Sequence, residues 1–205
     1  HDDTYFIEYM QNDSVVELTQ ELCSVQSQEW CYTLQDKMSF NLYGKTYTHT
    51  LRHSTIEDFY SDRNTITEYL VERFNYKSYL EIGCGNNVSF AQNSGLFEHH
   101  AFCVDPYMGG THRMTSDEYF AVNKLTYDLI FIDGLHTALQ VLKDVENSLH
   151  VLNEGGTILI HDSNPRNESY QIHFDEISSE ELKMWTGDVW KALVVLRTQP
   201  NIELI

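Results

Sequence analysis

Residues 79–85 read Tyr79-Leu-Glu-Ile-Gly-Cys-Gly85, and this stretch decides the fold. A short apolar run that carries one acid is followed by two glycines, Gly83 and Gly85. Glycine allows backbone angles that a Cβ would block, and it lets the chain pass close beside a ligand. Asp105 lies twenty residues after Gly85, at the end of a second apolar run, 101–104. A glycine turn with an acid about 20 residues later predicts a nucleotide site in a doubly wound α/β sheet, where the acid bonds the ribose hydroxyls.

The residues around the glycine turn disfavour two common kinds of nucleotide. A dinucleotide fingerprint needs a third glycine, and Val88 stands at that position. The chain also has no Gly-x-x-x-x-Gly-Lys loop of the kind that cradles phosphates. Glu81 beside the turn instead complements a cation. The sulfonium and amino groups of S-adenosylmethionine are cationic, so we expect this cofactor; a dehydrogenase is a distant alternative.

From residue 61 onward the pattern of apolar residues alternates between strand and helix. Strands are predicted at 78–82, 101–105, 127–133 and 157–161. Helices are predicted from about 61, at 88–97, at 117–123, from Thr137 to the pair Gly155-Gly156, and at 188–197. This order predicts an α/β, doubly wound, Rossmann-like fold with a mostly parallel sheet and helices on both faces.

The first 60 residues have no strong periodicity. Residues 38–43 alternate like a strand, and short helices are plausible near 14–25 and 55–60. We expect 1–60 to be a short N-terminal cap on the substrate side and 61–205 to be the S-adenosylmethionine-binding domain. The chain starts at His1 rather than Met and stops within a strand-like run, so we expect a piece of a longer protein.

Composition narrows the class of partner. The 205 residues are 41% hydrophobic and 21% charged, as in an ordinary globular domain. The net charge of −18 disfavours nucleic acid and anionic membrane, which need basic surface. No run of 18 apolar residues and no signal peptide is visible. We therefore expect a cytoplasmic protein that acts on a small-molecule substrate; the oligomeric state is left open, a homodimer included.

The four cysteines do not suggest a zinc site, because none of them form a Cys-x-x-Cys pair. Cys84 and Cys103 are interpreted as small buried apolar side chains. Cys23 and Cys31 could pair, although a reduced state is the default for a cytosolic protein.

Three segments together resemble a known family. Residues 79–85, Val104-Asp105-Pro106 and 127–134 resemble the successive motifs of class I S-adenosylmethionine-dependent methyltransferases. The run Phe131-Ile-Asp-Gly-Leu-His-Thr137, with Val141-Leu-Lys-Asp144 and His161-Asp162 further on, is similar to methyltransferase family 24 and to macrocin-type O-methyltransferases. The resemblance covers roughly 62–197.

The resemblance implies a set of cofactor contacts. Gly83 and Gly85 would contact the methionine part of S-adenosylmethionine through backbone groups, with Glu81 beneath it. Asp105 would hold the ribose hydroxyls, and Pro106-Tyr107 would line the adenine. The alternative interpretation is that Glu81 and Asp105 are only solvated at the ends of their strands and do not contact the cofactor.

The chain also departs from the family pattern. Only 21 residues separate Asp105 from the strand that starts at Tyr127, so we expect the usual third strand and its helix to be reduced or missing. The antiparallel hairpin that closes such a sheet is expected to be cut off after Ile205. Leu135 stands where macrocin-type enzymes carry an acid, which argues against a direct transfer of their mechanism.

Polar residues follow the two later strands. Asp133 and His136 follow one, His161 and Asp162 the next, and carboxyl ends of neighbouring parallel strands meet at one edge. The resemblance implies that Asp133, Asp162 and His161 hold a divalent cation such as Mg²⁺ or Mn²⁺, which would lower the pKa of a bound hydroxyl. Imidazole at one ligand position would suit a transition metal better. The other interpretation is that Asp133 contacts the cofactor, Asp162 caps a turn and no metal binds.

His136 is the first candidate for a general base, since its reference pKa is near neutral, and His161 is the second. Their presence favours a hydroxyl or amine acceptor. The sequence thus predicts methyl transfer from S-adenosylmethionine to a small molecule, with oxygen as the favoured acceptor atom. Two alternatives stay open: a metal-independent N- or C-methyltransferase of the same fold, and a noncatalytic cofactor-binding or interaction module of a larger protein.

Overall fold

The computed structural model describes residues 5–8, 37–42, 45–50, 63–165, 168–171, 185–199 and 202–204. The helices expected near 14–25 and 55–60 lie outside these ranges, as does the pair Cys23 and Cys31. No helix among the described residues has the length and hydrophobicity needed to cross a membrane.

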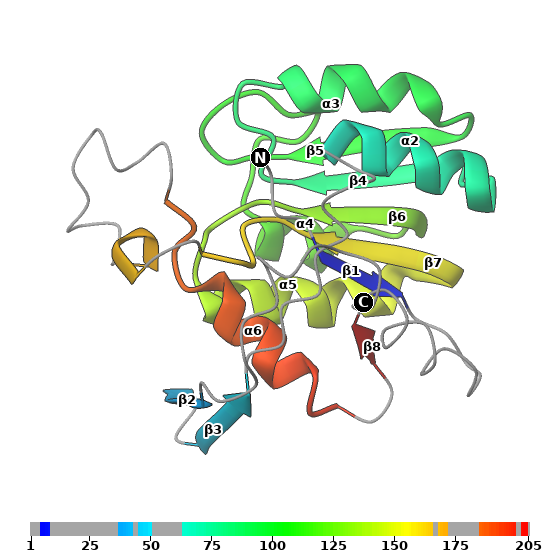
Figure 1. Ribbon diagram of the computed structural model, residues 1–205. Coiled ribbons are helices and arrows are strands. Elements are labelled where there is room, and N and C mark those ends of the chain that lie inside the picture. Colours follow the sequence, from blue (N-terminus) through cyan, green and yellow to red (C-terminus); the bar gives the residue numbers. More distant parts are fainter. Residues whose placement is uncertain are drawn as a thin grey trace.

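A six-stranded sheet forms the centre of the molecule, in the order β5-β4-β6-β7-β1-β8 (Figure 1). Four strands run parallel: β5 (His100–Val104), β4 (Ser78–Ile82), β6 (Tyr127–Ile132) and β7 (Leu152–Ile160). β1 (Tyr5–Glu8) pairs antiparallel with β7, and β8 (Glu203–Leu204) pairs antiparallel with β1. A separate hairpin joins β2 (Lys37–Leu42), close to the strand expected at 38–43, to β3 (Lys45–Thr50).

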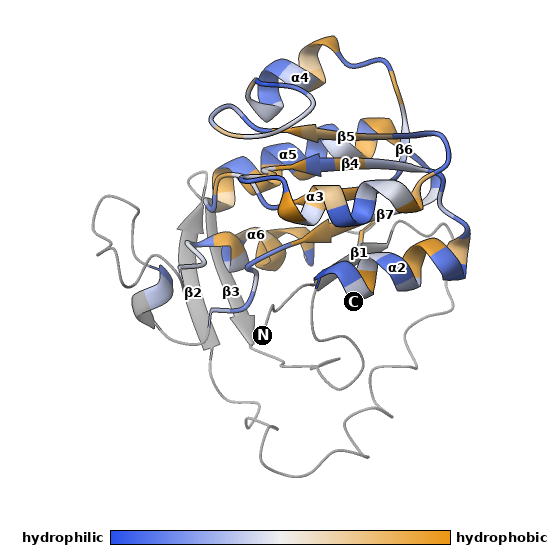
Figure 2. Cartoon of the chain, turned by 90° about the horizontal axis from the view of Figure 1, so that it is seen from above, coloured by the Kyte–Doolittle hydropathy of each residue, from blue (hydrophilic) through white to orange (hydrophobic). Residues whose placement is uncertain are grey.

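Helices lie on both faces of the sheet, as the sequence predicts. α2 (Arg63–Phe74), α3 (Val88–Asn93) and the 3₁₀ turn η1 (Ser94–Leu96) cover one face, and α4 (Ser116–Val122), α5 (Ala138–Val151) and α6 (Val189–Leu196) cover the other. α2 and α3 lie above the strands in Figure 1, and α5 and α6 lie below. α6 is largely hydrophobic in Figure 2, and seven of its eight residues are buried.

The strands are buried on both faces because their side chains alternate between two cores. Leu80, Ile130 and Ile158 belong to the core under α4, α5 and α6. Their neighbours Tyr79, Leu129 and Leu159 belong to the core under α2, α3 and η1. Apolar side chains in both phases of the two-residue repeat are typical of a central parallel strand.

The segment between β5 and β6 is short, as expected. Residues 105–126 contain α4 and an isolated bridge from His112 to Val104, but no full strand, and no strand pairs with β5 on its outer side among the described residues. α4 begins at a full capping box between Thr115 and Glu118. The reduced third strand-helix unit leaves β5 at the edge of the sheet.

The opposite edge differs from the expected ending. The place beside β7, where the resemblance predicts a C-terminal hairpin, is taken by β1, with β8 beyond it. The four residues of β1, which belong to the segment 1–60, are therefore part of the sheet. The role of the rest of that segment as a cap, and the domain boundary at residue 60, stay predictions.

Two expectations about local structure are wrong. The pair Gly155-Gly156 does not end α5; the helix ends at Val151, and both glycines lie inside β7. A Cβ on Gly156 would lie 2.8 Å from the carbonyl oxygen of Asp128, so close packing against β6 requires this glycine. Cys84 and Cys103 are both buried, as expected, but they are not two separate side chains, because the structure joins them as a disulfide with their Cα atoms 6.1 Å apart.

Candidate functional site

The glycine turn after β4 is held by contacts that need its glycines. Gly83 has φ +85° and donates its N–H to the carbonyl of Val104 at 2.8 Å. A Cβ on Gly83 would lie 2.0 Å from the carbonyl oxygen of Asp133. Gly85 has φ +48° and donates its N–H to Oδ2 of Asp105 at 2.9 Å. The turn thus connects the ends of β5 and β6.

Asp105 organises the loop that follows β5. Its Oδ1 accepts the N–H groups of Tyr107 and Met108, both at 2.8 Å, and the residue is 8% exposed. A carboxylate has about four acceptor positions, so three hydrogen bonds leave room for a ribose hydroxyl. Tyr107 itself is 84% exposed and has its ring free of the core.

The loop after Tyr107 folds back onto the glycine turn. A Cβ on Gly109 would lie 2.6 Å from the carbonyl oxygen of Gly85. Oδ1 of Asn87 accepts the N–H of Gly110 at 2.7 Å, and Arg113 donates to the carbonyl of Tyr107 at 3.0 Å. The loop and the turn therefore form one packed unit at the end of β4 and β5.

Glu81 lies below the turn and is almost completely buried, with 1% exposure. Its Oε2 accepts the hydroxyl of Tyr79 at 2.8 Å. Burial raises the pKa of Glu81 to about 7, against the opposing effects of the Tyr79 hydroxyl and the Arg63 guanidinium. The residue lies beneath the turn, on the face of β4 that points to α2.

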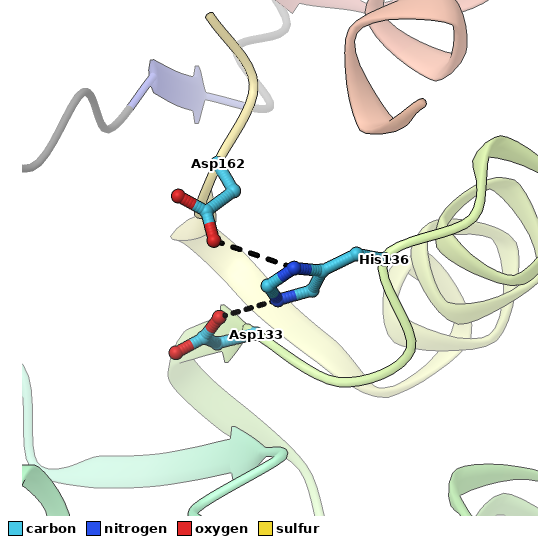
Figure 3. Close-up of side chains that lie close together, drawn as sticks. All are labelled: Asp133, His136 and Asp162. Atoms are coloured by element: carbon cyan, nitrogen blue, oxygen red, sulfur yellow. Dashed lines mark hydrogen bonds and ion pairs between the residues drawn. The ribbon is translucent and has the colours of Figure 1, made fainter. Parts of the chain in front are cut away.

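Four side chains gather where β6 and β7 end. Ile132 pairs with Ile160 in the register of these strands, so the residues that follow both strands become neighbours. His136 lies between two carboxylates, with Nε2 3.1 Å from Oδ1 of Asp133 and Nδ1 3.4 Å from Oδ2 of Asp162 (Figure 3). His161 places Nδ1 at 3.1 Å from Asp133 and 3.2 Å from Asp162.

The surroundings of this cluster favour the charged forms of Asp133 and His136. Burial opposes ionisation of Asp133, but His161 and His136 outweigh it and hold the pKa of Asp133 below its ordinary value. Burial likewise disfavours a charged His136, yet Asp133 and Asp162 raise the pKa of its imidazole. Asp162 has φ +53°, an uncommon backbone conformation for a residue other than glycine. Such outliers are found at functional sites, where surrounding contacts hold them.

Residues 185–188, which precede α6, hold the backbone of His136. A Cβ on Gly187 would lie 1.9 Å from the carbonyl oxygen of His136, and that oxygen accepts the N–H of Asp188 at 3.2 Å. Oδ1 of Asp188 in turn accepts the N–H of Ala138 at 2.7 Å. Trp185 stacks on the imidazole of His136, with the ring centroids 5.0 Å apart.

Arg63 belongs to this site, although the sequence does not single it out. Its Nη1 lies 2.7 Å from Oδ2 of Asp133, and its Cζ lies over the ring of Phe131. An isolated arginine at the start of a helix has no motif around it. Only the packing of α2 against β6 brings it to the end of the sheet.

The cluster fits a divalent cation in its chemistry. One ligand atom each from Asp133, His136 and Asp162 can be chosen so that all lie within 4.8 Å of one another. This group contains His136 where the sequence predicts His161, although His161 contacts the same carboxylates. Two carboxylates and one imidazole are ligands that Mn²⁺ and similar ions accept.

Comparison with known proteins supports the fold, and it finds a family match for one segment of the chain. Residues 108–163 match a family model described as a methyltransferase domain. This segment of the chain is therefore similar to part of a methyltransferase domain. The matched segment includes Asp133, His136, His161 and Asp162, whereas the glycine turn and Asp105 lie before it. No curated protein matches the chain.

Solved structures align with this chain, and the first of those named here supports its fold. A protein from Klebsiella pneumoniae, described as an O-methyltransferase, aligns with a TM-score of 0.50 at 15% identity over 71% of this chain and 72% of its own. An O-methyltransferase from Bacillus cereus in complex with SAH gives 0.49 at 13% identity, over 71% and 73%. A Staphylococcus aureus protein described as a caffeoyl-CoA O-methyltransferase gives 0.48 at 19% identity, over 68% and 75%.

Proposed function

We propose that this chain is a methyltransferase, and that it transfers the methyl group of S-adenosylmethionine to a hydroxyl group of a small molecule. The observation that carries the proposal is the meeting of two groups at one edge of the sheet. The glycine turn with Asp105 lies at the ends of β4 and β5, and the Asp–His cluster lies at the ends of β6 and β7. Open α/β sheets bind ligands at this edge.

The first group would bind the methyl donor. Asp105 would accept a ribose hydroxyl with its remaining acceptor capacity, while its existing bonds keep the glycine turn and the following loop in place. The exposed ring of Tyr107 would cover the adenine, together with Pro106. Gly83 and Gly85 would let the donor lie against the backbone, with Glu81 beneath it.

The second group would prepare the acceptor. Of the two candidate bases, His136 is the more exposed, with 17% against 9% for His161, so it is the better placed to take a hydroxyl proton. Asp133 and Asp162 would hold the imidazolium that forms. Methyl transfer is an in-line displacement, so alignment of donor and acceptor supplies much of the rate.

A divalent cation would have Asp133, Asp162 and one of the two imidazoles as its ligands. When bound, such an ion would lower the pKa of the acceptor hydroxyl and orient it. One observation favours the metal-independent alternative: the imidazole of His136 already lies between the two carboxylates, 3.1 Å from Asp133 and 3.4 Å from Asp162, so a cation would compete with it.

The test is transfer of a radiolabelled methyl group from S-adenosylmethionine to a panel of hydroxyl- and amine-bearing small molecules. Each reaction is run with Mg²⁺, with Mn²⁺ and with a strong chelator. We expect labelled product at a hydroxyl and loss of product with the chelator. Unchanged activity in chelator would select the metal-independent reaction. Cofactor binding without product from any acceptor would support a noncatalytic module and contradict the proposal.

A further inference from the structure

Arg63, the first residue of α2, places a permanent positive charge among the acids at the end of the sheet. Its guanidinium is bonded to Asp133 at 2.7 Å and lies 5.8 Å from the centre of the Phe131 ring. Its charge also acts on Glu81, whose pKa it lowers against the effect of burial. The side chain is 27% exposed, so a ligand at this edge can reach it.

The guanidinium has unused capacity to donate hydrogen bonds. Arginine carries five N–H donors, and within the described part of the chain only Nη1 is bonded, to Asp133. The planar fork of two N–H groups matches a carboxylate in a bidentate pair. Arg63 can therefore keep Asp133 and take a second carboxylate.

The order of the strands puts such a carboxylate within reach. The ribose is expected at Asp105, after β5, and the substituent at its 5′ position extends over the glycine turn of β4. Because β4 lies between β5 and β6, a ligand that continues in this direction arrives at the end of β6, beside Arg63 and Asp133. In S-adenosylmethionine this substituent ends in an amino acid, with an ammonium and a carboxylate.

The carboxylate of that amino acid needs a cation in a strongly acidic setting. The chain has a net charge of −18, and Glu81, Asp133 and Asp162 line this part of the edge. Among the described residues, Lys77 pairs with Glu98, Lys143 with Asp117 and Lys191 with Asp188, and Arg113 donates to backbone carbonyls of the loop after β5. We propose that Arg63 binds the α-carboxylate of the methyl donor, and that it makes the site specific for the complete amino-acid end. This inference rests on the proposed function and assigns it a further binding residue.

The experiment compares two ligands that differ only in this carboxylate: S-adenosylmethionine and its decarboxylated analogue. Calorimetry with the wild-type chain should show that decarboxylation weakens binding by about tenfold or more, since a charged hydrogen-bonded pair is lost. In Arg63→Met the two ligands should bind with affinities within about twofold of each other. Arg63→Lys should give an intermediate ratio, because the charge stays but the bidentate fork is lost.

Arg73 provides the matched control, since it lies in the last turn of the same helix and is exposed. Arg73→Met should keep the wild-type ratio. The ratio of the two affinities separates a contact with the ligand from a structural role of Arg63. If the substitution only loosened Asp133, it would weaken the binding of both ligands alike. A ratio in Arg63→Met that equals the wild-type ratio overturns the assignment while leaving the proposed function intact. A wild-type chain that binds neither ligand overturns the proposed function, and the assignment with it.

Discussion

The two ends of β6 each carry an aspartate, and their partners differ in kind. At the beginning of the strand, Oδ2 of Asp128 accepts the N–H of Lys77 at 2.7 Å and the N–H and hydroxyl of Ser78 at 3.0 Å. Its Oδ1 accepts the amide of Asn153 at 2.7 Å. All of these donors are neutral, and they lie at or just before the beginnings of β4 and β7. Asp128 therefore joins three neighbouring strands at their amino ends.

Asp133, directly after the strand, is held by three side chains that carry or accept charge. Arg63, His136 and His161 surround it, and two of them can exchange protons. Neutral donors fix a carboxylate as part of the fold, whereas charged or titratable partners can be exchanged for a ligand, a proton or an ion. We therefore expect the same residue type to have a structural role at one end of the strand and a chemical role at the other.

The largest effect is expected from Asp133→Asn. The variant loses the charge that holds Arg63, His136 and His161, so methyl transfer to the acceptor found in the labelled-methyl assay should fall by on the order of 100-fold or more. The melting temperature should change little by comparison. Activity within about threefold of wild type would show that Asp133 has no chemical role.

The buried acid in the site should make folding depend on pH. The pKa of Glu81 is raised to about 7, so between about pH 4.5 and 7 the native state binds more protons than the unfolded state. Stability from this group is therefore lost as pH rises through that window. Glu81→Gln should be more stable than wild type at pH 8 by up to about 3 kcal/mol and should lose this advantage near pH 4. Denaturant unfolding at both pH values measures it.

Asp144 on α5 is the control for Glu81. Burial raises its pKa to about 6, with Gln140 as a hydrogen-bond partner. Asp144→Asn should also gain stability at pH 8, but it should bind S-adenosylhomocysteine as wild type does, whereas Glu81→Gln should bind it more weakly. Equal binding by both variants would remove Glu81 from the cofactor site, and a pH-independent difference would contradict the raised pKa.

A smaller loss of stability is expected from Asp128→Asn. The amide cannot accept on both sides, so one or two donors from Lys77, Ser78 and Asn153 lose their partner, which should lower the free energy of unfolding by about 1–3 kcal/mol. The pKa of Asp128 is lowered, so its contribution is present above pH 4 and lost on acidification. Cofactor affinity should not change; a loss of affinity in folded protein would erase the distinction between the two ends of β6.

Tyr107 should give the smallest effect. Its ring is almost fully exposed, so Tyr107→Ala should weaken S-adenosylhomocysteine binding by only about three- to tenfold, through lost stacking on adenine. Tyr107→Phe keeps the ring and should bind as wild type. Identical affinities in all three proteins, measured by calorimetry, would place the adenine elsewhere.

The sequence predicts the parallel strands well because each is a short, mostly apolar run followed by turn residues. The runs at 78–82 and 127–133 are apolar in both phases, which only a strand buried on both faces requires. The residues after those strands, from Gly83 and Gly85 to Asp133 and His136, could be named because strand ends in this fold share one edge.

The remainder depends on contacts that have no local pattern. Arg63 reaches Asp133 across 70 residues, and Cys84 meets Cys103 only because β4 and β5 are neighbours. The end of α5 was predicted too late because Gly155 and Gly156 look like a helix terminus, whereas both lie inside β7, where Gly156 lets the strand pass close to Asp128. Each of these features follows from packing between elements rather than from the order of residues within one.

The central claim is that the glycine turn and Asp105 form the donor site of a methyltransferase. Calorimetric titration of S-adenosylhomocysteine into the wild-type chain and Asp105→Ala tests it most directly, with thermal melting to verify that both are folded. We expect saturable binding to the wild type and a loss of at least about tenfold in the variant, because the ribose contact and the support of Gly85 and Tyr107 both disappear. Equal binding by the two proteins, or no binding by the wild type, would contradict the claim.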